Sequence, residues 1–285
     1  MKEVIKKYIP NIISESKLSE AELEDAFIKY RTRLDSLVQI QNSPDKPHCL
    51  FDWVLLAKRG DEKAISFLMY LESEVFELLE RTEQKFHNQI RGTIKKIVSS
   101  IDTNVEIPNN PKYLNFIGEI VGLNHIIYSA GERFKLKAIE QKMPNPKRAD
   151  FVFYDKELDD EIYVDFVSIH NIDTKKLSND DDLISFLEGR FNRKLESKTP
   201  NLDENFHRIK LKDGKEVNFA ILPLIWTEIC DLIPFKSAFK KIDNKYANVF
   251  SCLSLLPQLF DDGTITYNIC RVSDILDCWK EQINT

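Results

Sequence analysis

Residues 147–170, KRADFVFYDKELDDEIYVDFVSIH, contain two apolar runs joined by a short acidic stretch. Apolar runs of this length on either side of a turn-forming segment predict two neighbouring β-strands. Each predicted strand has one aspartate inside its apolar run, Asp150 in the first and Asp165 in the second. A carboxylate in an interior strand loses hydration, so it requires a cationic partner, hydrogen bonds or a metal ion. The two aspartates are therefore the first candidates for a functional site.

The segments on either side predict a mixed α/β (α+β) fold. Residues 112–130 have the spacing of a helix, and residues 133–142 alternate apolar and charged side chains as a half-exposed strand does. Residues 180–197 predict a second helix, and the nearly uninterrupted apolar run 217–226 predicts a central strand covered on both faces. The order helix, three strands, helix, strand indicates a mixed sheet flanked by helices.

The first hundred residues predict helices only. Ser19 followed by Glu22 is a capping-box pattern, and it precedes a long run of apolar residues at helical spacing. Residues 102–112, rich in asparagine and proline, predict a linker. The sequence therefore predicts an N-terminal helical domain, 1–105, and an α/β domain, 106–285.

Composition and charge bound the class of protein. The formal net charge of −6 argues against a uniformly basic nucleic-acid coat, whereas a local basic groove is compatible with it. The sequence shows neither a secretion signal nor a run of about 18 apolar residues, so we expect a protein without a membrane span. The five cysteines are scattered and lack C-x-x-C spacing, which predicts reduced thiols in the cytoplasm and disfavours a zinc site.

Several common catalytic motifs are missing from the sequence. The five histidines lack the spacing of a zinc enzyme, and the eight glycines form neither a dinucleotide-binding loop nor a Walker-type loop. His170, at the end of the second predicted strand, is interpreted as a polar strand end. The acidic residues thus remain the main candidates.

Three acids are positioned to form a metal site: Glu119 in the predicted helix, Asp150 and Asp165. Two neighbouring strands can bring one carboxylate each to within about 5 Å of the other. Magnesium prefers hard oxygen ligands, typically one or two carboxylates with waters and substrate phosphate. The sequence therefore predicts a site for Mg²⁺ (or Mn²⁺) formed by these three residues.

With these residues in this order, the chain resembles the PD-(D/E)xK nuclease superfamily, which has the restriction-endonuclease-like fold. The resemblance covers about residues 112–230: the helix with Glu119, RADF with Asp150, YVDFV with Asp165, then a helix and a buried strand. It implies a metal-dependent endonuclease that hydrolyses DNA or RNA, with a role in microbial defence or restriction. Asp150 matches the first aspartate of the motif, Asp165 matches the (D/E), and Glu119 matches a helical glutamate that some members add.

The chain departs from the motif at Val167, where the family has a lysine that positions or deprotonates the attacking water. Residues 165 and 167 share one face of a strand, and valine supplies neither charge nor proton. One interpretation is that another element supplies the basic residue, with Lys137, Arg190 and Lys194 as candidates. The other is a degenerate site, in which the fold serves as a nucleic-acid-binding or protein-interaction module.

Purely structural roles for the two aspartates are the alternative interpretation. Asp150 could cap the turn that precedes it. Asp165 could form a purely structural salt bridge, with Lys137 or Arg148 as its partner.

A basic helix face follows the two strands. Arg190, Lys194 and Lys198 advance by four residues, and Arg193 lies beside them, so these four residues predict a stripe that contacts a phosphate backbone. The alternative is a solvated helix face. The expected partner is nucleic acid, with DNA favoured over RNA, and a homodimer or a partner protein of a larger complex is a further expectation.

Overall fold

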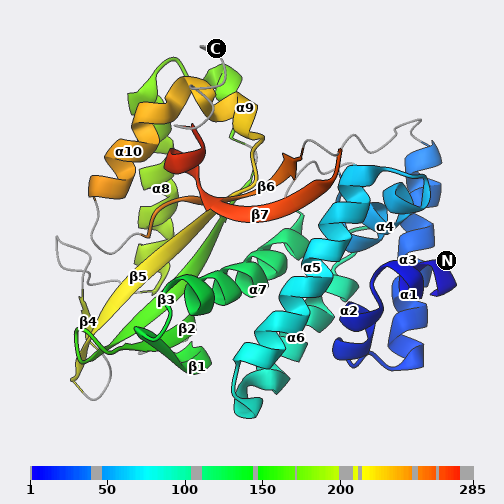
Figure 1. Ribbon diagram of the computed structural model, residues 1–285, viewed down its shortest axis with the longest axis horizontal. Helices are drawn as coiled ribbons and strands as arrows, with labels where there is room; N and C mark the ends of the chain where they lie inside the picture. The colour runs from blue at the N-terminus through cyan, green and yellow to red at the C-terminus, as the bar shows by residue number, and fades with distance from the viewer. Residues whose placement is uncertain are drawn as a thin grey trace. The chain divides into compact units, whose positions relative to one another are not determined.

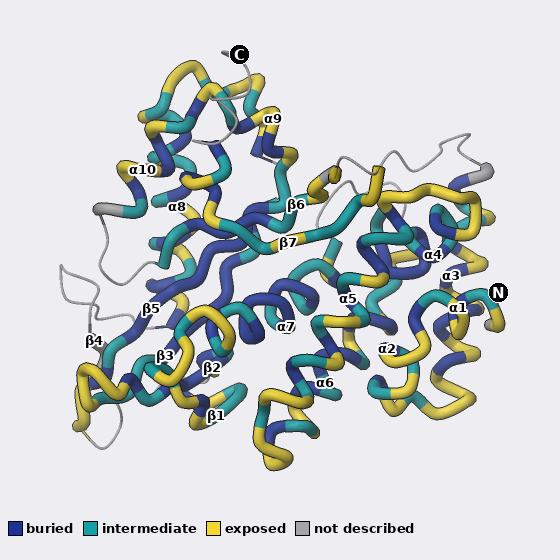
Figure 2. The backbone as a smooth tube through the Cα atoms, viewed as in Figure 1, coloured by how far each residue is buried: buried dark blue, intermediate teal, exposed yellow. Residues whose placement is uncertain are grey.

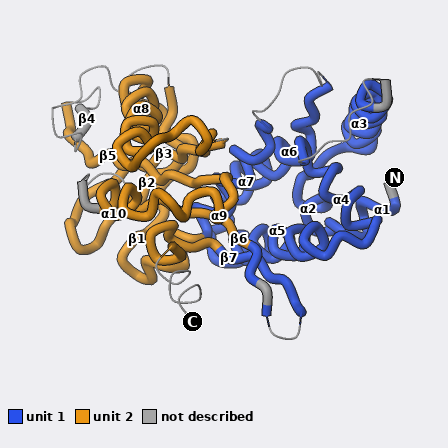
Figure 3. Tube along the Cα trace, turned by 90° about the horizontal axis from the view of Figure 1, so that it is seen from above, with its two compact units in different colours: residues 1–124, 257–268 blue, residues 125–256, 269–285 orange. Residues whose placement is uncertain are grey.

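A computed structural model describes residues 2–39, 47–103, 111–143, 147–170, 172–198, 208–210, 214–245, 250–260 and 263–276. The chain forms two compact units, residues 1–124 with 257–268 and residues 125–256 with 269–285 (Figure 3). The expected domain boundary after residue 105 lies outside the described residues. The chain passes from the first unit to the second within helix α7 (Lys112–Ser129).

The first unit is helical over its N-terminal part. Its helices are α1 (Lys2–Tyr8), α2 (Pro10–Glu15), α3 (Glu20–Gln39), α4 (Leu50–Lys58), α5 (Glu62–Arg81), α6 (His87–Ser99) and the first part of α7 (Figure 1). The predicted capping box is confirmed at the start of α3, where Ser19 Oγ accepts from the Glu22 N–H and Glu22 Oε2 accepts from the Ser19 N–H. Helix α5 packs against α2, α4 and α6, and its buried residues include Phe67, Leu71 and Val75.

The sheet is mixed, which confirms the predicted fold class. Its strands are β1 (Phe134–Lys142), β2 (Arg148–Asp155), β3 (Asp160–Ile169), β4 (Arg208–Lys210), β5 (Glu216–Ile225), β6 (Leu253–Leu259) and β7 (Ile265–Arg271). Among the described residues the order is β1-β2-β3-β5-β6-β7, with β4 paired to β5. Strands β1, β2 and β3 pair antiparallel, whereas β3 with β5 and β5 with β6 pair parallel.

Helix α8 (Asp180–Lys198) lies in the chain between the parallel strands β3 and β5. Together with α9 (Ile229–Leu232) and α10 (Lys236–Lys245), it covers one face of these strands (Figure 1). Four α8 residues spaced by four, Leu183, Leu187, Phe191 and Leu195, are buried in this layer. Figure 2 shows β3 and β5 buried over most of their length, as the predicted central strand requires. The apolar core therefore fixes α8 against β3, and this packing positions the candidate site.

Candidate functional site

The candidate site lies where β2 and β3 separate. The antiparallel ladder between these strands ends with the pair Phe151 and Val164. Beyond that pair, β2 continues to pair with β1 as far as Arg148, and β3 continues to pair with β5 as far as Ile169. Asp150 and Asp165 are the next residues on the two strands, so they occupy the point of separation.

The two carboxylates hydrogen-bond each other's strand at this point. The Asp150 N–H donates to Asp165 Oδ1 at 3.0 Å, and the Phe166 N–H donates to Asp150 Oδ2 at 2.7 Å. A buried backbone N–H requires an acceptor, and here the carboxylates take the place of the ladder carbonyls. Both side chains are therefore held by backbone groups, which fixes their orientation toward each other.

Two lysines of α8 point into the same group. Lys194 Nζ lies 3.1 Å from Asp165 Oδ2 and 3.7 Å from Asp150 Oδ2. Lys198 Nζ lies 2.8 Å from Asp165 Oδ2 and also donates to the carbonyl of Arg148. We call Asp150, Asp165, Lys194 and Lys198 the acid–lysine cluster.

The acid–lysine cluster has a buried half and a half that reaches solvent. The side chain of Asp165 is 0% exposed and that of Lys198 is 9% exposed. The side chains of Asp150 and Lys194 are 23% and 28% exposed. A ligand arriving from solvent would therefore meet Asp150 and Lys194 first, with Asp165 and Lys198 behind them.

The carboxyl of Asp150 is in an environment unfavourable to its charge. Burial raises the pKa of Asp150, and the nearby negative charge of Asp165 raises it further, whereas Lys194 and Lys198 lower it without cancelling the rise. Acids with perturbed pKa values cluster at functional sites, although structural ion-pair networks perturb pKa values too.

Asp155, at the other end of β2, shows the contrasting structural case. Its side chain is 2% exposed, and its carboxylate accepts hydrogen bonds from Arg133 Nε and from the N–H of Glu157. Burial raises the pKa of Asp155, but the Arg133 hydrogen bond and the two backbone hydrogen bonds lower it more, so the net shift is downward. Asp155 therefore stabilises the β2–β3 turn as an anion.

The structure distinguishes among the three candidates for the missing basic residue. Lys194 contacts both aspartates. Lys137 is exposed, and its Nζ lies 5.4 Å from the ring centroid of Tyr154. The guanidinium of Arg190 lies 5.4 Å from the ring centroid of Phe186.

The other predicted site residues are placed as follows. Arg193 is exposed and its Nε donates to the Gly189 carbonyl at 2.8 Å. Lys198, expected in a phosphate-binding surface stripe, is buried in the acid–lysine cluster, because α8 turns this face toward β3. Glu119 belongs to the first unit, whereas the four residues of the acid–lysine cluster all belong to the second unit. The salt bridge of Asp165 is made with α8 lysines, whereas Arg148 pairs with Glu140 at 3.0 Å.

Val167 occupies the motif position because that position belongs to the apolar core. Val167 is 8% exposed and packs in the same layer as Leu187 and Phe191 of α8. A lysine at 167 would place a third cation beside Asp165 and insert a longer side chain between β3 and α8. The lysine contact is instead supplied from the helix that covers Val167.

We expect Val167→Lys to lower the free energy of unfolding by about 2 kcal/mol or more, since it overpacks the core and buries an additional charge. Urea denaturation of the parent, of Val167→Lys and of Val167→Met measures these free energies of unfolding. The methionine variant is the control for side-chain size alone. A lysine variant as stable as the methionine variant would contradict the assignment of this position to the core.

The acid–lysine cluster offers two carboxylates, those of Asp150 and Asp165, as candidate ligands for a divalent cation. Asp150 Oδ2 and Asp165 Oδ2 both approach one positive charge, that of Lys194 Nζ, so in this structure an ammonium group occupies the position between them. Magnesium is held in many enzymes by one or two carboxylates with waters and substrate phosphate. Within the described ranges, no group of three or more acidic, histidine or cysteine side chains could hold a metal ion. An ion at this position would therefore have two carboxylate ligands, with its remaining ligands supplied by water or substrate.

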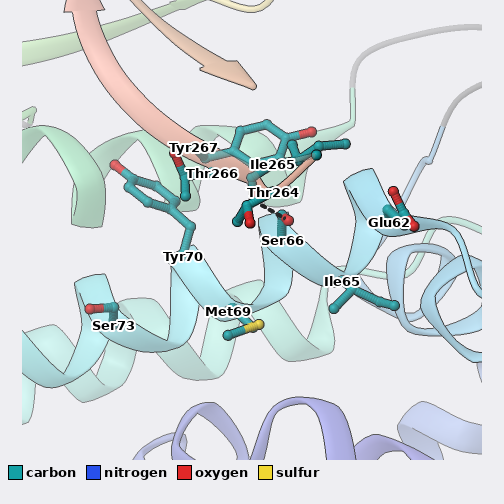
Figure 4. A pocket seen from close by; sticks show the side chains of 11 residues that line it. Glu62, Ile65, Ser66, Met69, Tyr70, Ser73, Thr264, Ile265, Thr266 and Tyr267 are labelled. Atoms are coloured by element: carbon teal, nitrogen blue, oxygen red, sulfur yellow. Dashed lines mark hydrogen bonds between the residues drawn. The ribbon is translucent and has the colours of Figure 1, made fainter. Parts of the chain in front are cut away.

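A separate pocket of about 600 Å³ lies in the first unit, between α5 and the start of β7 (Figure 4). Ser66 on α5 donates a hydrogen bond to the Ile265 carbonyl on β7, which joins the two walls. The lining is largely apolar and aromatic, including Met69 and Tyr267, and Glu62 is the one charged side chain among the described residues that form it. None of the predicted site residues belongs to this pocket.

Comparisons of the chain with protein-family models, with curated proteins and with solved structures found no match in any of the three. The assignment of function therefore rests on the residues and geometry of the acid–lysine cluster. None of the described helices combines the length and apolarity needed to cross a membrane.

Proposed function

We propose that the second unit is a metal-dependent phosphodiester hydrolase, a nuclease in which Lys194 replaces the lysine missing at position 167. The observation that carries this proposal is the position of Lys194 Nζ, 3.1 Å from Asp165 Oδ2 and 3.7 Å from Asp150 Oδ2. One ammonium group in contact with both acids meets the requirement of a motif of two acids and one base. The order of elements around the acids also agrees with the resemblance to the PD-(D/E)xK superfamily.

In this proposal Asp150 and Asp165 hold Mg²⁺ or Mn²⁺. The ion, when bound, would lower the pKa of a water molecule and neutralise charge on the phosphodiester. Lys194, which is partly exposed, donates to a phosphate oxygen and stabilises the negative charge that develops in the transition state. Lys198 acts from the buried side as a positioning residue, because its contact with Asp165 holds that carboxylate in place and compensates its charge.

The proposed substrate is nucleic acid, because the exposed Arg190 and Arg193 lie on the same helix as Lys194. DNA is proposed in preference to RNA on the resemblance alone. A role in microbial defence follows from the resemblance alone. A cytoplasmic location is proposed from cysteine usage. A homodimer or a larger complex is also proposed from the resemblance.

A second candidate function is a non-catalytic nucleic-acid-binding module. The observation that favours it is the charge balance of the acid–lysine cluster, in which two lysines neutralise two aspartates and Asp165 is fully buried. Such a module would bind nucleic acid without a divalent ion, and its affinity would not change in Asp150→Ala.

The test is incubation of the purified protein with plasmid DNA, single-stranded DNA and RNA, in Mg²⁺, in Mn²⁺ and in EDTA. The proposal predicts cleavage by the parent in either metal, none in EDTA and none by Asp150→Asn. Lys175→Gln, an exposed change outside α8, controls for general loss of surface charge. Equal traces of cleavage in the parent and Asp150→Asn would indicate contamination and would refute the hydrolase. Metal-independent binding unaffected by Asp150→Ala would establish the second candidate.

A further inference from the structure

An aromatic pair lies at the carboxyl ends of the parallel strands β3 and β5. His170 follows the last residue of β3, and Trp226 follows the last residue of β5. The backbone N–H of Trp226 donates to the Ile169 carbonyl at 3.0 Å, which links the two strand ends. The two rings are nearly parallel, with an interplanar angle of 12° and centroids 6.2 Å apart. The carboxyl ends of parallel strands are where α/β folds usually bind ligands.

The pair presents a flat and uncharged surface. Both residues are half-buried, and Trp226 Nε1 is buried without a hydrogen-bond acceptor among the residues that the structure describes. Any indole surface that reaches solvent is therefore apolar ring. Burial lowers the pKa of His170 to about 4, with the positive charge of Arg190 as a second cause, so the imidazole is neutral at physiological pH. Flat, neutral aromatic surfaces stack on nucleobases with little regard for sequence.

Helix α8 connects this pair to the acid–lysine cluster. Arg190 is close enough to His170 for its charge to lower the histidine pKa. Lys194, one helical turn further along, contacts Asp150 and Asp165. One turn advances by about 5.4 Å, so two cations follow each other along one face of α8 from the aromatic pair to the acids. In a nucleotide strand, a base is likewise followed by successive phosphates, so the order of aromatic pair and cations along α8 matches the order of these groups.

We propose that His170 and Trp226 form a stacking subsite for an unpaired nucleobase, with Arg190 contacting the phosphate of the same nucleotide. The ligand class that this subsite selects is single-stranded nucleic acid, because a base inside a duplex is already stacked on both faces. The inference rests on the proposed function, since it names the substrate class of the same site.

The experiment measures binding in the Asp150→Asn background, in which cleavage is not expected. An end-labelled oligothymidylate of about ten nucleotides matches the length of a single binding site. Its anisotropy and the tryptophan fluorescence of the protein are recorded together, beside a duplex of equal length. We expect the single strand to quench tryptophan fluorescence and to bind more tightly than the duplex.

Substitutions at Trp226 then separate stacking from the signal that reports it. Adding Trp226→Leu should weaken single-strand binding by about tenfold or more, the usual effect of losing one stacked base, and leave duplex binding unchanged. Trp226→Phe should keep the affinity and lose the quenching. Trp53→Phe, in the first unit, should lose neither. Arg190→Gln should reduce the salt slope of single-strand binding by about 0.7, the value for one phosphate contact.

Circular dichroism checks the fold of each variant. Should the leucine variant not fold, the phenylalanine variant decides: quenching that persists in it refutes the subsite. Unchanged single-strand affinity in a folded Trp226→Leu variant refutes it as well, as does an absence of binding to the single strand. Failure of the hydrolase looks different: the parent would not cleave in Mg²⁺ or Mn²⁺, while the quenching and its loss in Trp226→Phe would remain.

Discussion

Asp150→Asn is expected to lower the cleavage rate by about 10³-fold or more, because it removes one of the two carboxylates that hold the metal ion. The same substitution should leave the free energy of unfolding at pH 7 equal to or above that of the parent. Asparagine retains an oxygen for the hydrogen bond from the Phe166 N–H, and it lacks the charge that is unfavourable at this position. Loss of activity without loss of stability is the signature of a functional carboxylate.

The sign of the pH dependence follows from the raised pKa of Asp150. Its contribution to stability is full below the unfolded value of 3.8 and is lost as the pH rises through the folded value, so the parent is penalised at neutral pH. Asp155 has the opposite sign, because its pKa is lowered: its contribution is present above 3.8 and is lost as the pH falls.

Asp155→Asn is therefore the matched control on the same strand. It should cost about 2 kcal/mol at pH 7, as expected for hydrogen bonds to a charged group, and should leave cleavage by the folded protein intact. Urea denaturation between pH 3 and pH 8 measures the free energy of unfolding of both variants as a function of pH. If Asp150→Asn were the more destabilising of the two substitutions, the conclusion that the charge of Asp150 destabilises the folded protein would be wrong.

Substitutions of the two lysines of the acid–lysine cluster should likewise differ in their effects on cleavage rate and on stability. Lys194→Met is expected to lower the cleavage rate by about 100-fold or more, the typical effect of removing one electrostatic donor to a transition state. Since Lys194 is 28% exposed and Asp165 keeps its contact with Lys198, the loss of Lys194 should lower the free energy of unfolding less than the loss of Lys198 does.

Lys198→Met should cost about 3 kcal/mol, because it removes a partner from the fully buried Asp165. Single-turnover cleavage and urea denaturation of both variants measure the contrast. The roles assigned to the two lysines would be contradicted if Lys198→Met were as stable as the parent, or if Lys194→Met retained the parent rate.

Much of the fold could be predicted from local patterns. The capping box at Ser19, the alternation in β1 and the unbroken apolar run of β5 each determine an element directly. Strands β4 and β6 were not predicted, because β4 has only three residues and β6 contains Pro257, which weakens the strand pattern. Both are recognisable as strands only through their partners in the sheet.

The candidate site was only partly predictable, because it too depends on contacts between residues that are far apart in the sequence. The two aspartates stand out within their strands, and Lys194 was one of three candidates for the basic residue. The packing of α8 on β3, a long-range effect, determines which candidate reaches them. One local signal was overlooked: Lys194 and Lys198 each lie three residues beyond a buried residue of α8, Phe191 and Leu195, and so flank its buried face.

Binding of Mn²⁺, measured by the loss of the free-ion signal in electron paramagnetic resonance, decides whether Asp150 and Asp165 form a metal site. We expect one ion per chain for the parent and none for Asp150→Asn. We expect binding at least as tight for Lys194→Met, because the ammonium group of Lys194 competes for the same two oxygens. No binding to the parent, or equal binding to the parent and Asp150→Asn, would contradict a metal site at Asp150 and Asp165.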